Sequence, residues 1–347
     1  MVQHIASLAV VGLLLGILLW DAERSQSLSH YSTSKNAARQ PVVIDTDIGS
    51  FLDDFVAIAF AVQNSYLDVK LIITSSDDTI TRAKIAAKFL SLLGRDDIPI
   101  AIGVKNSNQT IHTFWDWAAD VNLSRYKGGV SEDGIQKMGE VIMASPVPVD
   151  ILAIGPMTNF PNLLTSFPQV VKNANVQAMM GSIYKGYDNA SSPTAEYNVK
   201  LCPDCANQLL HAGWNVTMTP LDTCEYVILD IDLEKELLSG TNAAVLTLAN
   251  AFLYDCLTST VECTGPVRTD PPVLFDAVGT LLLLPNASSY IVFQELKLSV
   301  NATGYTVIDS SSGFPVNVAL YWQKDDGLHN FEKYMVNVLI ASNATFI

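Results

Sequence analysis

Residues 42–54 read Val-Val-Ile-Asp-Thr-Asp-Ile-Gly-Ser-Phe-Leu-Asp-Asp. Three β-branched apolar residues lead into a polar loop with four carboxyl groups, and an apolar helical pattern follows from Phe55 to Val62. This order predicts a buried strand, a tight turn and a helix. Because ligands bind outside the carboxyl ends of the strands in an open α/β sheet, we expect a ligand site at this turn.

The four acids of this turn are Asp45, Asp47, Asp53 and Asp54. Carboxylates this close in sequence repel one another, and without a cation some would have to take up protons. Carboxylate oxygens are the ligands that Ca²⁺ and Mg²⁺ prefer. The alternative is that the Asp pair only caps the helix, near the positive end of its dipole. We favour a metal site, because Gly49 permits a close approach across the turn.

The same succession of strand, polar strand end and helix recurs along the chain. Strands are predicted over 67–74, 98–102, 149–154, 176–180, 214–220, 290–298, 305–308 and 316–322, and helices over 81–93, 131–144, 232–239, 242–260 and 327–341. Such alternation is typical of a mostly parallel sheet. We therefore predict an α/β fold, a single Rossmann-like domain whose mostly parallel central sheet is flanked by helices.

Composition supports one globular domain. Of 347 residues, 49% are apolar and 16% are charged, which is typical of a folded chain. The net charge of −15, without a basic cluster, argues against a nucleic-acid partner. No Pro- or Gly-rich boundary interrupts residues 41–347, so we assign them to one catalytic domain.

The N-terminus differs from the rest. The apolar run from Ile5 to Trp20 is short for a transmembrane helix and suits a signal peptide. Because no Lys or Arg precedes it and no small-x-small cleavage site follows, an uncleaved anchor stays the alternative, and only that would place the protein at a membrane. We assign residues 1–24 to this segment and residues 25–40, which are Ser-rich, to a flexible linker. Seven glycosylation acceptors further favour export through the secretory pathway: Asn108, Asn122, Asn189, Asn215, Asn286, Asn301 and Asn343.

Five cysteines fit a secreted chain. Cys202 and Cys205 stand three apart, Cys256 and Cys263 seven apart, and Cys224 is alone. Two local disulfides and one thiol are expected. A zinc site at the first pair is the alternative, but no paired Cys or His motif supplies two more ligands.

The Asp45-x-Asp47-x-Gly49 turn with its Asp53-Asp54 pair resembles the opening motif of the inosine-uridine-preferring nucleoside hydrolase family. The resemblance implies that Asp47 and Asp54 bind Ca²⁺ and that Asp53 contacts the ribose. Asp47 would also accept a proton from the attacking water. Three residues separate Gly49 from the Asp pair where many members have one. The apolar N-terminus and the acceptors indicate a secreted, eukaryotic-type member.

Two later elements extend the resemblance. Residues 155–159, Gly-Pro-Met-Thr-Asn, are similar to a family signature whose Thr gives its backbone carbonyl to Ca²⁺, which implies Thr158 as a ligand. The Thr158-Asn159 pair can also cap the next helix. Residues 193–198, Pro-Thr-Ala-Glu-Tyr-Asn, resemble an element whose Glu and Asn bind ribose hydroxyls. This implies Glu196 and Asn198 as ribose contacts, with an exposed polar loop as the alternative.

Two further ribose contacts are matched less directly. An Asn at the end of the second strand touches the ribose in the family, and Asp77 takes its place here, or Asp78 if the register slips. A helix cap is an equal alternative. Asn189 is nearest to another ribose-contacting Asn, but as a glycosylation acceptor it cannot both carry a glycan and line a pocket.

The residues that would bind and protonate the leaving base are the least evident in the sequence. The family carries a His-Asp pair where this chain has Phe275-Asp276. The resemblance implies Asp276 as the last Ca²⁺ ligand, whereas Phe275 leaves the acid for the base in doubt. Residues 104–132 contain several aromatic side chains and lack periodicity. They are expected either to form a base-binding lid or to pack over the sheet. The lid candidates, from this segment and one later loop, are His112, Trp115, Trp117 and Tyr187.

These motifs predict a Ca²⁺-dependent ribonucleoside hydrolase that releases ribose and free base in nucleoside salvage. The chain has no Gly-rich phosphate cradle, so a nucleoside is favoured over a nucleotide. One alternative is a metal-dependent protein that binds nucleosides or ribose without turnover, which Phe275 and Asp77 favour. Another is a phosphatase-type hydrolase, which the lack of a spaced His pair disfavours. Homo-oligomerisation stays open.

Overall fold

The computed structural model describes residues 39–106, 113–260, 262–264 and 267–341. The chain divides at Arg39, and the unit Gln40–Ile347 contains the fold. The signal segment 1–24 and all but the end of the linker 25–40 lie outside the described residues, so these assignments stay predictions. No described helix combines the length and apolarity that crossing a membrane requires.

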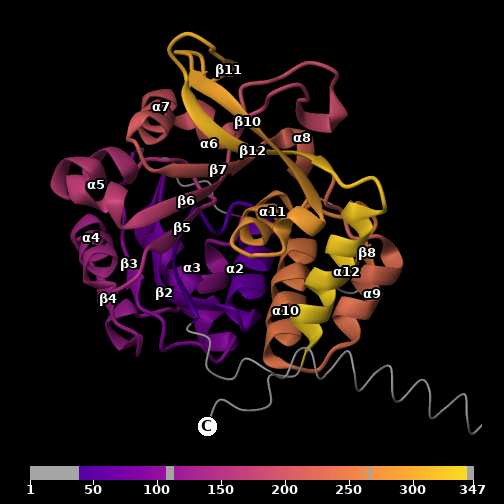
Figure 1. The fold of residues 1–347 in the computed structure, drawn as a ribbon. Helices are drawn as coiled ribbons and strands as arrows, with labels where there is room; N and C mark the ends of the chain where they lie inside the picture. Colours follow the sequence, from indigo (N-terminus) through magenta and orange to yellow (C-terminus); the bar gives the residue numbers. More distant parts are fainter. Residues whose placement is uncertain (1–38, 107–112, 261, 265–266, 342–347) are drawn as a thin grey trace, which may run out of the picture. The chain divides into compact units, whose positions relative to one another are not determined.

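Among the described residues, ten strands form one sheet in the order β11-β10-β12-β7-β6-β5-β1-β2-β3-β4 (Figure 1). Only β10 pairs antiparallel, with β11 and with β12, and the other neighbours within this described sheet are parallel. The strands are β1 (Gln40–Thr46), β2 (Leu67–Thr74), β3 (Ile100–Ala101), β4 (Val130–Ser131), β5 (Val149–Ala153), β6 (Ala174–Met179), β7 (Asn215–Thr219), β10 (Ile291–Val300), β11 (Thr306–Ile308) and β12 (Phe314–Trp322). A separate antiparallel pair joins β8 (Cys263–Thr264) to β9 (Val267–Arg268).

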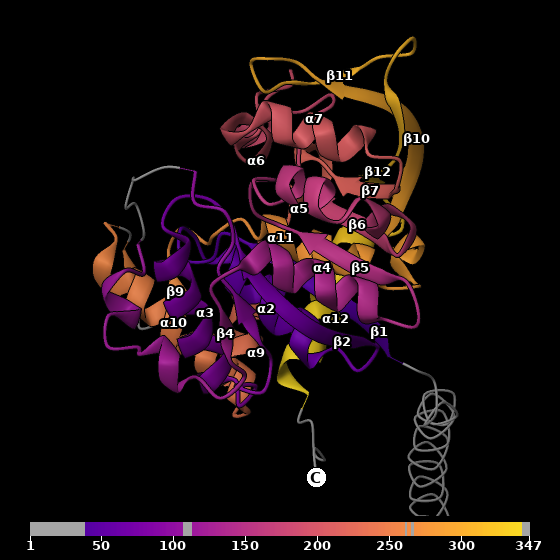
Figure 2. The same cartoon turned by 90° about the vertical axis from the view of Figure 1, so that its left-hand side faces the viewer.

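Helices cover both faces of the sheet (Figures 1 and 2). The apolar cluster on one face includes residues of α2 (Asp53–Gln63), α3 (Thr79–Leu92), α10 (Ala243–Thr258), α11 (Phe275–Leu282) and α12 (Gly327–Ile340). The cluster on the other face includes residues of α4 (Gly134–Ala144), α5 (Phe160–Ser166) and α7 (Pro203–His211). The remaining α-helices are α6 (Tyr197–Leu201), α8 (Leu221–Cys224) and α9 (Ile231–Ser239). Short 3₁₀ helices are η1 (Asp116–Ala118), η2 (Leu123–Arg125), η3 (Pro168–Lys172), η4 (Tyr187–Asn189) and η5 (Ala287–Ser289).

Strand β1 is apolar on both faces because both faces are covered. Val42 and Ile44 pack into one apolar cluster and Val43 into the other, and all three side chains are fully buried. The chain passes from β1 to β2 on one side and later returns to β5 on the other. This reversal opens a crevice at the carboxyl end of β1, where ligands bind in such sheets.

The predicted fold class is confirmed, and the differences are local. The strand expected over 98–102 shrinks to Ile100–Ala101, and helices α6 to α8 were not predicted, whereas the helix expected after Thr158-Asn159 is α5. The expected disulfides Cys202–Cys205 and Cys256–Cys263 are present, and Cys224 is a buried thiol. The zinc alternative is therefore wrong, because both of its sulfur ligands are in a disulfide.

Candidate active site

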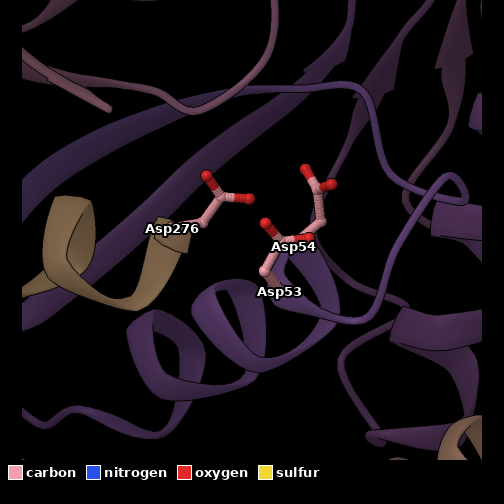
Figure 3. Close-up of side chains that lie close together, drawn as sticks. All are labelled: Asp53, Asp54 and Asp276. Carbon is pink, nitrogen blue, oxygen red and sulfur yellow. The ribbon is translucent and has the colours of Figure 1, made fainter. Parts of the chain in front are cut away.

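Three carboxylates meet at the carboxyl end of β1. Asp53 and Asp54 lie in the first turn of α2, and Asp276 lies in the first turn of α11. One carboxylate oxygen from each of the three lies within 4.8 Å of the others, and all three side chains are buried. Figure 3 shows the carboxyl group of Asp276 facing that of Asp53. Two helix N-termini thus direct acids into one small volume.

These carboxylates carry strongly perturbed pKa values. Burial, followed by the charge of Asp47, raises the pKa of Asp53 to about 7. Burial and then the neighbouring carboxylates hold the pKa values of Asp54 and Asp276 well above the usual range. The Thr46 hydroxyl donates a hydrogen bond to Asp54 and opposes its shift. Burial and mutual repulsion therefore oppose full ionisation of this group unless a cation is present.

Asp47 lies in the loop after β1, beside an arginine that we did not anticipate. Its Oδ2 atom is 3.6 Å from Nη2 of Arg82, whose side chain is fully buried. Burial raises the pKa of Asp47, and the Arg82 charge opposes this rise. Asp47 lines the same pocket as the three clustered carboxylates but lies outside their 4.8 Å group.

Glu196 is held firmly by backbone N–H groups. Its Oε1 accepts a hydrogen bond from Asn198 N at 2.8 Å, and its Oε2 accepts from Gly181 N at 2.9 Å and from Val199 N at 3.1 Å. Burial outweighs these bonds and raises the pKa of Glu196 to about 7. This residue therefore caps the N-terminus of α6 in a fixed orientation on the pocket wall.

Asn198 is fixed in a similar way. Its amide nitrogen donates to the carbonyl oxygens of Ile154 at 3.0 Å and Met179 at 3.2 Å. Since these bonds engage the donor side of the amide, its oxygen remains the group suited to accept from a ligand hydroxyl. Glu196 and Asn198 both line the pocket, as a pair of ribose contacts would require.

The turn after β5 holds the neighbouring strand ends together. Thr158 is buried, and its Oγ1 accepts from Ser76 N at 3.3 Å. Asn159 occupies the N-cap position of α5, but its side chain does not cap the helix; its amide donates instead to Asp45 Oδ2 at 2.8 Å. A Cβ atom on Gly155 would lie 2.8 Å from Asp47 N, so this close approach requires glycine.

A pocket of about 620 Å³ lies beside the clustered carboxylates. Of the predicted site residues, it is lined by Asp47, Asp53, Asp54, Tyr187, Glu196, Asn198 and Asp276. Lining residues that sequence reasoning missed include Phe51, Tyr197, Lys200, Arg268 and Asp270. The mixture of clustered acids and aromatic side chains suits a polar ring attached to a flat heterocycle.

The lid candidates occupy different places. Trp117 is buried against Phe55 and Phe114, as the packing alternative predicts, and Trp115 is exposed. Neither Trp side chain lines the pocket. Tyr187 does, and its ring packs edge-on against Phe275 at a centroid distance of 6.0 Å. His112 lies outside the described residues.

Two implied ribose contacts lie away from the pocket lining. Asp77 Oδ2 accepts a hydrogen bond from Arg82 Nη2 at 3.2 Å, whereas Asp78 caps α3. Asn189 is exposed and accepts a hydrogen bond of 2.5 Å from Tyr226 Oη. Their substrate-binding roles stay predictions.

The most consequential residue missed from the sequence is Arg82. A signal existed, because Arg82, Ile85, Ala86 and Phe89 follow the i, i+3, i+4, i+7 spacing of one helix face. All four are buried. An arginine on an apolar stripe requires a buried acidic partner, and the nearby acids supplied candidates.

The donor set fits a hard divalent cation. Asp53, Asp54 and Asp276 offer only carboxylate oxygens, which Ca²⁺ and Mg²⁺ prefer. Within the described residues no ion pair reaches these three side chains, since Arg82 pairs with Asp47 and Asp77 instead. A cation would therefore relieve the repulsion that raises their pKa values.

Comparisons with known proteins agree on one family. Residues 42–340 match the family model described as inosine-uridine preferring nucleoside hydrolase. The non-specific ribonucleoside hydrolase RihC of Klebsiella pneumoniae is 30% identical over 205 residues, which cover 56% of this chain and 65% of that protein. The pyrimidine-specific ribonucleoside hydrolase RihA of Citrobacter koseri is 30% identical over 203 residues, or 52% and 60%. The matches thus span less than two thirds of these curated relatives.

Solved structures share the fold at lower identity. A plant nucleoside hydrolase, PpNRh1, has a TM-score of 0.71 and 19% identity, and the match covers 88% of this chain and all of that one. The purine-preferring ribonucleoside hydrolase from Gardnerella vaginalis has a TM-score of 0.67 and 16% identity, with coverage of 86% and 99%. At these identities the likeness concerns the fold.

Proposed function

This chain belongs to the inosine-uridine preferring nucleoside hydrolase family, and on that premise we propose that it hydrolyses the N-glycosidic bond of ribonucleosides to ribose and free base. The observation that carries the proposal is one pocket that combines the buried acids Asp53, Asp54 and Asp276 with Glu196 and Asn198. The reaction would serve nucleoside salvage.

We propose Ca²⁺ as the cofactor, held by Asp47, Asp54, Asp276 and the backbone carbonyl of Thr158. Asp53 is close enough to the group to contact the cation as well as the ribose. When bound, a hard divalent cation acts as a Lewis acid that lowers the pKa of water.

The chain's own residues divide the remaining work. Asp47 accepts the proton of the attacking water, which is general-base catalysis. Glu196, Asn198 and Asp53 hold the ribose hydroxyls while the sugar ring flattens toward an oxocarbenium ion. The backbone hydrogen bonds of Glu196 fix its orientation before substrate arrives, so little reorganisation is needed on binding.

Incubation of the purified protein with inosine, uridine and AMP, followed by measurement of free ribose, tests this function. We expect ribose from one or both nucleosides in the presence of Ca²⁺ and none from AMP. The rival is a protein that binds nucleosides without turnover, which the non-ionisable Phe275 in the pocket favours. Saturable inosine binding without ribose release would support that rival.

Export is a separate proposal. The acceptors Asn122, Asn189, Asn215, Asn286 and Asn301 are exposed, as glycan attachment requires, while Asn108 and Asn343 lie outside the described residues. A glycan on Asn189 would exclude it from ribose binding. Glycosidase treatment of natively produced protein should shift its gel mobility, and an unchanged mobility would contradict export.

A further inference from the structure

Arg82 joins two loops that border the candidate active site. Its Nε donates to Ser76 O at 3.2 Å, in the loop after β2. Its Nη1 donates to Ile48 O at 3.2 Å and to Ser50 Oγ at 3.1 Å, in the loop after β1. Because the side chain has no exposed surface, these bonds replace the water it would otherwise bind.

Two carboxylates face the remaining nitrogen of Arg82. Asp77 Oδ2 lies 3.2 Å from Nη2 and Asp47 Oδ2 lies 3.6 Å from it. A buried guanidinium needs a paired negative charge, and the shorter contact makes Asp77 its principal counter-ion. Asp47 therefore lies beside a positive charge that another acid already neutralises.

The backbone holds Asp77 in this role. Ser76 and Asp77 have φ angles of 65° and 50°, a left-handed conformation that residues with a side chain rarely adopt. Asn106 Oδ1 accepts a hydrogen bond from Asp77 N at 2.8 Å and supports this turn. The carboxylate of Asp77 is thereby directed at Arg82.

We propose that Asp77 and Arg82 form a charge-matched pair that positions Asp47 for cation binding. The inference rests on the proposed function, since it assigns Asp47 to a cation. The pair sums to zero charge, so Asp47 keeps its full charge for the cation while hydrogen bonds from Arg82 fix the loop that carries it. In this chain Asp77 is thus a positioning residue, in place of the ribose contact that the resemblance implies.

A double-mutant cycle tests the pair through Ca²⁺ binding, measured by titration calorimetry without substrate. Asp77→Asn leaves Arg82 with Asp47 as its acidic partner, so we expect Ca²⁺ affinity to fall about tenfold or more, the usual scale for residues that support ligands. Asp77→Asn/Arg82→Met removes both charges and should regain part of that affinity, because Asp47 no longer faces an unpaired guanidinium, although the loop hydrogen bonds of Arg82 are lost. This rescue separates positioning from a general loss of structure.

Asp78→Asn is the matched control. It removes the same charge one residue away and preserves the cap on Thr81 N, because Asn caps helices as well as Asp. We expect unchanged Ca²⁺ affinity. The thermal midpoint of Arg82→Met in chelator should lie below that of the double variant, because Arg82→Met leaves the buried Asp77 without its counter-ion.

The possible results are distinct. Wild-type protein that binds Ca²⁺, together with Asp77→Asn that matches Asp78→Asn, would overturn the charge pair and leave the proposed function intact. A double variant no better than Asp77→Asn would also overturn the pair. Wild-type protein that neither binds Ca²⁺ nor releases ribose would refute the proposed function, and the positioning role with it.

Discussion

One carboxylate oxygen of Asp54 and one of Asp276 lie within 4.8 Å of each other, although the two residues lie in the first turns of helices far apart in the sequence. Each helix N-terminus favours a negative charge through its free N–H groups and dipole. Two buried carboxylates at this separation nevertheless repel, which is one cause of their raised pKa values. The fold therefore brings together charges that only protons or a cation neutralise.

Removal of divalent cations should abolish activity and lower thermal stability. Chelated protein retains the repulsion among Asp53, Asp54 and Asp276, whereas added Ca²⁺ binds only the folded state and so stabilises it. The measurement is ribose release and the thermal midpoint during a Ca²⁺ titration after chelation. Asp276→Asn should blunt both responses, and Asp325→Asn, at an exposed site, should not. Full activity at a metal content of nil would contradict the cation site.

Glu196 should make the metal-free protein less stable as pH rises. Its pKa is about 7 in the folded chain against 4.5 for an ordinary Glu, so the folded state binds its proton more tightly. This contribution is fully present below about pH 4.5 and is lost as pH rises through about 7, for a total of roughly 3 kcal/mol.

Glu196→Gln isolates this contribution, because the other carboxylates titrate in both proteins. Unfolding by denaturant in chelator should show wild type losing stability relative to the variant as the pH rises through about 7. In the variant, the amide NH₂ of glutamine would also face backbone N–H groups. This costs folding free energy by an amount that does not vary with pH. A difference between the two proteins that is constant with pH would contradict the assignment.

The fold was predictable because its signal is repeated and local. Strand β2 was expected over 67–74 and occupies Leu67–Thr74, because its first half alternates apolar and charged residues and residues 72–74 are β-branched. Helix α6 was missed because it is only five residues long and is stabilised by the Glu196 side chain, which accepts hydrogen bonds from N–H groups of its first turn. The length of strand β3 was overestimated. Only two of its residues pair with β2, and the sequence does not distinguish them from the unpaired apolar residues beside them.

The sequence allowed prediction of those site residues that directly follow the end of a strand. Asp47, Asp53 and Asp54 could be grouped because one turn carries them. Asp276 could be added only through the family resemblance, since its partners are more than two hundred residues away. The role of Arg82 depends on two loops meeting in space, which the sequence does not report.

Trp117 should contribute to stability and not to substrate binding. Its ring packs against Phe55 and Phe114, and its Nε1 donates to Asn250 Oδ1 at 2.9 Å. Trp117→Ala should therefore cost about 3–5 kcal/mol of unfolding free energy while KM for inosine stays unchanged. Trp115→Ala, at the exposed neighbour, should have almost no effect on stability. A raised KM for Trp117→Ala with normal stability would restore the lid assignment.

Tyr187 is the residue best placed to assist the leaving base in the absence of a histidine at position 275. Its Oη accepts a hydrogen bond from Tyr197 N at 2.9 Å, which leaves the hydroxyl proton available for a ligand in the pocket. Burial raises the pKa of Tyr187, so the hydroxyl stays protonated at neutral pH. The edge-on contact with Phe275 fixes the ring.

Tyr187→Phe removes this proton and keeps the ring, so it separates donation from stacking. We expect inosine turnover to fall by about 10²-fold, the lower range of general-acid effects, while nitrophenyl riboside turnover is preserved because that leaving group needs no proton. Tyr184→Phe, at an exposed tyrosine on the same loop, is the control and should leave both rates unchanged.

If Tyr187→Phe keeps full inosine turnover and Tyr187→Ala loses it, the ring acts by stacking alone. Equal losses on both substrates for Tyr187→Phe would mean that the hydroxyl supports the sugar or the fold. The proton donor to the base would then have to be another pocket residue. The cationic side chains on the described lining are Lys200 and Arg268.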